Sequence, residues 1–309
     1  MVIKNTYYYF KPIIPRRLQI AVRRKMAQRK LLLSKNIWPI DEKAGNPPIG
    51  WTGWPNNKRF ALVLTHDVES LKGYNKCSSL IWLEESLGFK SSFNFVPENY
   101  RIPLDLLIDI TSKGFEVGVH GLTHHGNLFK SKKAFQKKAL RINHYLNEWK
   151  SVGFRTPCMY HNLDWIHDLN IEYDASTFDT DPFEPQPDGM GKIFPFWVQK
   201  SGGKKGYVEL PYTLPQDFTL FILLNKNNID IWKQKLDWIV KQGGMALLIT
   251  HPDYMNLGKI KVDHDEYPAE YYEEFLNYIK STYKDQYWHV LPKDMACFWS
   301  KNITKARKE

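Results

Sequence analysis

From Phe60 onward, short runs of apolar residues alternate with longer segments of mixed polarity. The runs are continuously apolar, which is typical of strands whose two faces are both covered. The strand candidates are FALVLTH (60–66), SSFNFV (91–96), FEVGVH (115–120), VGFRT (152–156), IEYDAS (171–176), YVELPY (207–212), MALLITH (245–251) and WHVL (288–291). Strands of this kind separated by helices favour a closed α/β barrel over an open sheet.

Helix-length segments fill most of the intervals between these strands. They cover about residues 79–87, 104–112, 133–149, 164–170, 229–241 and 269–283. One stretch, YVELPYTLPQDFTLF (207–221), breaks the alternation, because its prolines and turn residues indicate a strand that leads into a long loop. We therefore predict a distorted (β/α) barrel of seven or eight strands.

The start of the chain follows another pattern. IPRRLQIAVRRKMAQRKLLL (14–33) predicts a basic helix that begins after Pro15, with Leu18, Val22 and Met26 at every fourth position. The next segment, DEKAGNPPIGWTGWPNNK (41–58), is rich in Pro, Gly and Asn and indicates an irregular connection.

We divide the chain accordingly into three parts. Residues 1–55 form a basic extension and linker, residues 56–300 the barrel, and residues 301–309 a basic tail.

The net charge of +10 is concentrated at the two ends of the chain. Residues 1–43 hold 11 Lys and Arg against only Asp41 and Glu42, the tail is also basic, and the body between is close to neutral. A nucleic-acid-binding protein should carry its charge on the folded body, so we expect no nucleic-acid partner. The predicted helix suits peripheral contact with an anionic membrane through residues 1–43. The alternative is a helix docked on the barrel with its Lys and Arg facing water.

Cysteine content and hydropathy bear on the compartment. The three cysteines are widely spaced and form no CxxC pair, so we expect buried free thiols and a reducing environment. MVIKNTYYYF lacks the apolar run of a signal peptide, and no stretch reaches the roughly 20 apolar residues that span a bilayer. We expect a cytoplasmic protein, peripheral to the inner face of the membrane if the extension binds lipid.

Ionisable residues stand at the ends of five predicted strands. In an α/β barrel the carboxyl ends of the strands converge on one face, where catalytic groups gather. The residues are Asp67 and Glu69 after the first strand, His120 after the third, Arg155 after the fourth, Asp174 in the fifth and His251 after the seventh.

The stretch VGVHGLTHHGN (117–127) contains His120, His124 and His125. If the chain turns into a helix there, His120 and His124 share a face and can bind zinc, whose catalytic sites commonly have three protein ligands. A carboxylate from the first strand would be the third ligand. The alternative is a helix start whose polar side chains cap backbone groups. We expect His125 to lie on another face, at the surface or behind the ligands.

Asp67 and Glu69 should point the same way on a regular strand. One can bind a metal ion while the other acts as general base, or both can be solvated acids at a strand end. His251 is a candidate general acid or an ordinary buried histidine. Arg155 and Asp174 either orient the charged groups or form a salt bridge at the barrel rim.

In chain order these elements resemble the motifs of the polysaccharide deacetylase (NodB-homology) family, carbohydrate esterases that act on N- or O-acetyl groups. The matching segments are LTHDVE (64–69), EVGVHGLTH (116–124), FRTP (154–157), YDAS (173–176) and LLITH (247–251). The resemblance covers about residues 60–251, and residues 1–55 have no counterpart in it.

The resemblance implies a distorted (β/α) barrel and a divalent metal, usually Zn²⁺. It implies that His120 and His124 are metal ligands, Asp67 the general base and His251 the general acid. By the same resemblance, Arg155 would hold Asp67 and Asp174 would tune His251.

One position departs from the family pattern. Val68 stands where the family usually has a second, metal-binding aspartate, and Glu69 is the nearest replacement. This resembles a branch with Asp-Val-Asp, which includes enzymes similar to imidases and peptidoglycan deacetylases. Either Glu69 or Asp67 would then complete the metal site.

The expected function is a metal-dependent hydrolase that removes acetyl groups from an N-acetylated saccharide, either a polysaccharide or a lipid-linked glycan precursor. Two alternatives stay open. Val68 and the aromatic content of 15% suit a carbohydrate-binding barrel that has lost catalysis. The Asp-Val-Glu spacing suits a hydrolase of another carbon–nitrogen bond, such as that of a cyclic imide.

Overall fold

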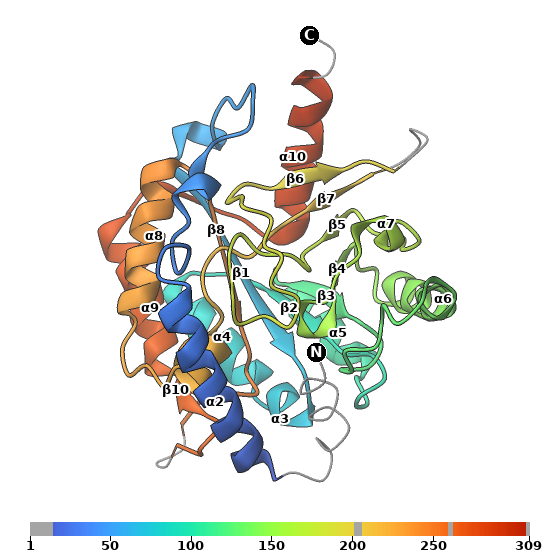
Figure 1. Ribbon diagram of the computed structural model, residues 1–309. Helices are drawn as coiled ribbons and strands as arrows, with labels where there is room; N and C mark the ends of the chain where they lie inside the picture. Colours follow the sequence, from blue (N-terminus) through green and yellow to red (C-terminus); the bar gives the residue numbers. More distant parts are fainter. Residues whose placement is uncertain (1–14, 201–205, 259–261, 307–309) are drawn as a thin grey trace.

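The computed structural model describes residues 15–200, 206–258 and 262–306 (Figure 1). Within them a curled sheet runs in the order β8–β1–β2–β3–β4–β5–β7–β6, with β11 beside the first half of β1. The strands are parallel except for β6, which is antiparallel to β7. Their bounds are β1 (Phe60–Val68), β2 (Ser92–Phe95), β3 (Glu116–His120), β4 (Gly153–Arg155), β5 (Tyr173–Asp174), β6 (Phe196–Val198), β7 (Tyr207–Glu209), β8 (Met245–Thr250) and β11 (Tyr287–His289).

An irregular segment brings the two sides of this sheet together. After β7, the backbone N–H groups of Thr213 and Leu214 both donate to the carbonyl of Leu247 in β8, at 3.1 Å. The N–H of Leu247 in turn donates to Oγ1 of Thr213 at 3.0 Å. The chain then enters a π-helix, η4 (Phe218–Leu223). The predicted distorted barrel is confirmed. The strand predicted at residue 207 leads into an irregular segment, but residues 218–221, which were expected in the loop, belong to η4.

Helices cover the outer face of the sheet, with α8 and α9 on one side and α5 and α6 on the other (Figure 1). All nine residues of β1 are buried, which accounts for its uninterrupted apolar run. The helix bounds are α3 (Leu71–Tyr74), α4 (Cys77–Leu87), α5 (Leu104–Ser112), α6 (Lys132–Glu148), α7 (Leu163–Ile166), α8 (Asp230–Gln242) and α9 (Glu270–Thr282), with short 3-10 turns η1 (Glu42–Gly45), η2 (Pro55–Asn57) and η3 (Pro157–Met159) and a small sheet of β9 (Met255–Asn256) and β10 (Tyr267–Pro268).

The N-terminal helix α2 (Arg16–Leu33) begins after Pro15, as predicted, and packs on η4. Ile20 and Ala27 form its buried side, at 3% exposure each. The predicted stripe faces outward instead, with Leu18, Val22 and Met26 between 40% and 55% exposed.

Three basic residues of α2 contact the barrel and do not simply face water. The Lys30 Nζ donates to the carbonyl of Pro182 at 2.6 Å. The Arg24 Nε donates to the carbonyl of Ile222 at 2.7 Å, and the Arg23 guanidinium lies 4.6 Å from the centre of the Phe218 ring. The helix is docked on the barrel, as the alternative expected, but Arg23, Arg24 and Lys30 do not face water as that alternative had them. Trp38 and Trp54 of the following connection are buried in the same core as the barrel strands.

A C-terminal helix, α10 (Pro292–Ala306), was not predicted and runs across the proposed boundary at residue 300. Its Met295 and Trp299 are buried. No helix of the described residues is long and apolar enough to cross a membrane. The three cysteines form no disulfide within the described residues, and only Cys77 is buried, while Cys158 and Cys297 are partly exposed.

Candidate active site

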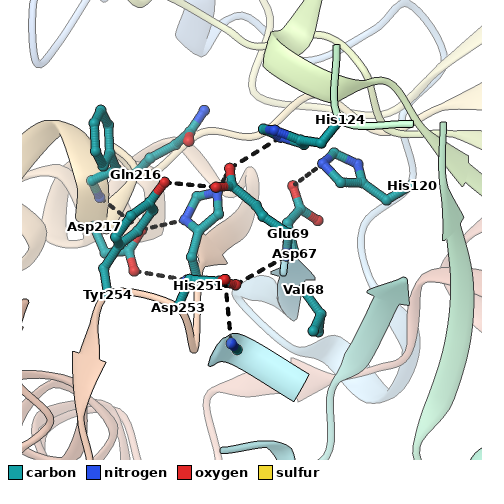
Figure 2. A network of polar contacts seen from close by, with 12 residues as sticks. Asp67, Val68, Glu69, His120, His124, Gln216, Asp217, His251, Asp253 and Tyr254 are labelled. Atoms are coloured by element: carbon teal, nitrogen blue, oxygen red, sulfur yellow. Dashed lines mark hydrogen bonds and ion pairs between the residues drawn. The ribbon is translucent and has the colours of Figure 1, made fainter. Parts of the chain in front are cut away.

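Two carboxylates and three histidines converge at the carboxyl ends of β1, β3 and β8 (Figure 2). The convergence follows from the sheet, in which β1 pairs with both β2 and β8 and the parallel strands end at the same edge. The closest approaches are His124 Nε2 to Glu69 Oε1 at 3.1 Å, His251 Nε2 to Glu69 Oε1 at 3.8 Å and His120 Nε2 to Asp67 Oδ2 at 3.9 Å.

The end of β1 sends alternate side chains to opposite sides. Asp67 and Glu69 point into the site, while Val68 points away from it (Figure 2) and is fully buried in the hydrophobic core. This is the alternation expected of an extended chain. The acid that reaches the site beside Asp67 is therefore Glu69.

Asp67 is held by one of its two oxygens. Its Oδ1 accepts hydrogen bonds from Arg155 Nη1 at 2.8 Å and from Asn94 Nδ2 at 2.9 Å, while Oδ2 faces His120. Burial alone would raise the pKa of Asp67, but the adjacent Arg155 guanidinium and the His120 ring hold that pKa well below its usual range. Asp67 is thus ionised at neutral pH, and Arg155 contacts it as expected.

His120 presents an unprotonated nitrogen to the site. Its Nδ1 lies 3.2 Å from the carbonyl oxygen of Arg155, and a carbonyl only accepts, so Nδ1 carries the hydrogen. Burial lowers the pKa of His120 to about 4, so the ring is neutral at neutral pH and Nε2 keeps its lone pair.

His124 does not lie on a helix, contrary to the expectation for the HxxxH pair. Residues 121–130 form bends and turns. Gly121 leaves the helical conformation with φ +65°, and no other residue fits there, since a Cβ would lie 2.5 Å from Cδ of Pro157. The turn still brings the two imidazoles together, with His120 and His124 ring centres 5.3 Å apart. His125 is exposed, as predicted.

Asn99 ties the exit of β1 to the loop that carries His124. Its Nδ2 donates to the carbonyl of Glu69 at 3.0 Å, and its Oδ1 accepts from the backbone N–H of His124 at 3.4 Å. One side chain thereby links the backbones of Glu69 and His124, two of the residues expected to bind metal.

Residues just after β8 position Glu69. The Tyr254 hydroxyl donates to Glu69 Oε2 at 2.6 Å, and Asp253 Oδ2 accepts from the Glu69 backbone N–H at 2.9 Å. Asp253 also accepts from the Ser70 hydroxyl. The sequence motifs end at His251 and did not indicate Asp253 or Tyr254, although both follow it closely in HPDY (251–254).

His251 is oriented by Asp217. Its Nδ1 lies 2.6 Å from Asp217 Oδ1, and its backbone N–H donates to Oδ2 at 2.7 Å. The Tyr267 hydroxyl donates to the same Oδ2 at 3.0 Å. Burial alone would lower the pKa of His251, but the Asp217 carboxylate, with Glu69 nearby, raises it to about 10. His251 is thus protonated at neutral pH.

Asp174 does not take the expected place beside His251. Its Oδ1 accepts from the Ser176 hydroxyl at 2.5 Å. Burial raises the pKa of Asp174, although a hydrogen bond with the buried Glu209 opposes this shift. The structure therefore corrects the partner of His251 from Asp174 to Asp217. A signal for Asp217 exists in the sequence, since it is the one charged residue in the apolar run TLPQDFTLFILL (213–224).

The donor set has the chemistry of a catalytic zinc site, which commonly combines histidine nitrogens with a carboxylate. His120 fits best, because metal-bound histidines usually hold their other ring nitrogen on a carbonyl or carboxylate, as it does. In the described part of the chain, however, no three His, Cys, Asp or Glu side chains are already arranged around one point. His124 and Glu69 pair with each other instead, so an ion would have to separate that pair.

Comparison with solved structures shows that the fold is shared with polysaccharide deacetylases. A putative polysaccharide deacetylase from Mycobacterium smegmatis is 17% identical with a TM-score of 0.60, covering 81% of this chain and 93% of that chain. A probable polysaccharide deacetylase from Pseudomonas aeruginosa PAO1 is 18% identical with a TM-score of 0.61, covering 85% and 98%.

An allantoinase, Puue, has the same fold, at 17% identity and a TM-score of 0.62, with 85% of this chain and 97% of that chain covered. No protein-family model matches the sequence, and no curated protein matches it. At such low identity the structural likeness establishes the fold.

Proposed function

We propose that this chain is a hydrolase that removes acetyl groups from an N-acetylated saccharide. The observation that carries the proposal is that one site contains a negatively charged side chain, Asp67, and a positively charged one, His251. Asp67 is held as a carboxylate by Arg155, and His251 is held as an imidazolium by Asp217. Amide hydrolysis needs such a pair, one group to accept the proton of water and one to protonate the leaving amine.

Asp67 is the proposed base. Its Oδ1 is occupied by Arg155 and Asn94, so Oδ2 is the oxygen that would accept the proton as water attacks the acetyl carbonyl. Arg155 fixes the carboxylate and keeps it ionised, which also limits its basicity.

His251 is the proposed acid. Nδ1 is committed to Asp217, so Nε2 is the nitrogen that would deliver a proton to the departing sugar amine. The same Nε2 is turned toward Glu69 and thus toward the centre of the site. Acetate and an amino sugar are the expected products.

His120, His124 and Glu69 would hold a divalent ion, most simply Zn²⁺, with Asp67 as the alternative carboxylate. When bound, the ion would supply an acidified water and polarise the carbonyl of the substrate. His120 would offer Nε2, since its Nδ1 is held by the Arg155 carbonyl.

Acetate release from N-acetylated chito-oligosaccharides, measured with added Zn²⁺, tests the proposal. Asp67→Asn and His251→Gln should each lower the rate by roughly 10²-fold or more, the usual size of a general acid or base contribution. His125→Ala, an exposed neighbour of His124, is the matched control and should behave as the parent. Full activity in both site variants would rule out this mechanism.

The allantoinase neighbour supports a second candidate, hydrolysis of a ring carbon–nitrogen bond. The same acid and base would serve, but the product would be an opened ring with no acetate released. Assays with allantoin and with cyclic imides, beside the acetylated oligosaccharides, separate the two candidates by their products.

A further inference from the structure

The outer face of α2 is unusually apolar for a surface without a partner. Leu18, Val22 and Met26 are 55%, 40% and 50% exposed. The row continues to the end of the helix with Leu32 and Leu33, 66% and 89% exposed, and Ile37 beyond the helix is 46% exposed. Apolar residues scattered singly on a surface are ordinary, but a contiguous row of this kind marks an interaction site.

The same face is basic. Lys25 and Arg29 are exposed on it, between the apolar side chains in the helical period, and residues 1–40 contain no Asp or Glu. Arg17, Arg24, Lys25 and His264 line a hollow of about 530 Å³ at its flank. Of the acids next to His264, Asp265 pairs with Lys72 and Glu266 with Lys72 and Lys76, while Asp263 is exposed.

We propose that the outer face of α2 docks on the surface of an anionic lipid bilayer. A helix that alternates basic and apolar side chains on one face gains from burying the apolar groups at the headgroup boundary and from the negative surface potential. A second copy of this chain fits the face poorly, because two such faces would bring like charges together. The proposal is independent of the reaction that the site performs.

The inner side of α2, opposite the docking face, contacts one wall of the candidate site. Arg23, on the inner side of α2, lies over the Phe218 ring, and Phe218 follows Asp217, the partner of His251. The Phe218 ring centre is 4.8 Å from that of Tyr254, whose hydroxyl contacts Glu69. A bilayer in contact with the outer face of α2 would therefore lie one helix diameter, roughly 10 Å, from one wall of the site.

Co-sedimentation of the full chain with vesicles tests the proposal. Vesicles of phosphatidylcholine containing phosphatidylglycerol should bind the protein, and vesicles of pure phosphatidylcholine should bind it much more weakly. Leu18→Ser, Val22→Ser and Met26→Ser combined should weaken binding about tenfold or more, since each removes apolar area from the contact. The matched control combines Leu104→Ser, Ile108→Ser and Leu140→Ser on α5 and α6, which are between 47% and 74% exposed and should leave binding unchanged.

A charge variant tests the electrostatic half of the proposal without touching the apolar row. Lys25→Glu with Arg29→Glu should weaken binding by roughly fivefold or more for each position, and raised salt should weaken the parent in the same direction. No binding by the parent, or equal binding by the parent and both α2 variants, would overturn the proposal. Concentration-dependent dimerisation that the serine variant abolishes would overturn it in favour of a second copy.

Discussion

Asp217 Oδ1 lies 2.6 Å from Nδ1 of His251, although 34 positions separate the two residues in the chain. The contact follows from the closure of the barrel, because the segment after β7 pairs with β8 through Thr213 and Leu247 just before each of them reaches the site. The segment between β7 and β8 thus supplies Asp217, the carboxylate that keeps His251 protonated.

Asp217→Asn should lower kcat by roughly 10²-fold, because the amide keeps the shape of the carboxylate but no longer stabilises the imidazolium. The fall of activity at high pH should also begin at a lower pH than in the parent. A pH profile of kcat/KM measures both effects. Tyr267→Phe is the control, since it removes a hydrogen bond to Asp217 but leaves its charge, and its profile should keep the parent's position. An unshifted profile in Asp217→Asn would contradict the assigned pairing.

Arg155→Met should cost about 3–5 kcal/mol of unfolding free energy, because it leaves the Asp67 carboxylate buried without a positive partner. Adding Asp67→Asn should recover part of that loss, since the buried charge is then gone. Urea unfolding of the two single variants and the double variant measures the coupling. Strictly additive losses would mean that the two side chains do not stabilise each other.

Glu116 should make stability depend on pH. Burial raises its pKa to about 7, although the Tyr173 hydroxyl and the Lys293 N–H oppose the shift. The folded chain therefore holds this proton more tightly than the unfolded chain. Its contribution is fully present below pH 4.5 and is lost as the pH rises toward 7, by about 3 kcal/mol at most.

Glu116→Gln should flatten that dependence, because the amide cannot ionise. Unfolding free energies at pH 5 and pH 8 measure it, with the exposed Glu172→Gln as the control that keeps the slope of the parent. A Glu116→Gln protein that loses as much stability as the parent over this range would show that Glu116 is not the group responsible.

The barrel could be predicted from the sequence because its strands are buried on both faces and so appear as continuous apolar runs. The short antiparallel β6 was not predicted, since Phe196, Trp197 and Val198 are only half-buried and Pro195 interrupts the apolar run IFPFWV (193–198) before them. Helix α10 was not predicted, because its apolar residues are spaced among Lys, Asp and Ser.

The convergence of the site residues was predictable because parallel strands end at a common edge. Asp67, His120, Arg155 and His251 each stand at the end of such a strand. Asp217 stands instead at the start of the π-helix η4, which no periodicity in the sequence indicated, and its approach to His251 depends on a tertiary pairing. The expected partner Asp174 also ends a strand, but Ser176 and Glu209 engage it within the sheet.

The spacing of apolar residues in α2 did not predict which side of the helix packs on the barrel. Leu18, Val22 and Met26 form the more obvious stripe, yet Ile20 and Ala27 pack on η4. Small and β-branched side chains allow close approach to the π-helix, and Arg23 and Arg24 add contacts that a hydrophobic pattern does not count.

Zinc titration of the metal-free chain by calorimetry is the most direct test of the central claim, that His120, His124 and Glu69 meet around one ion. The parent should bind one Zn²⁺ per chain. His124→Ala and Glu69→Ala should each weaken binding roughly 100-fold or more, and His125→Ala should match the parent. A parent that binds no zinc, or the same affinity in all four proteins, would contradict the claim.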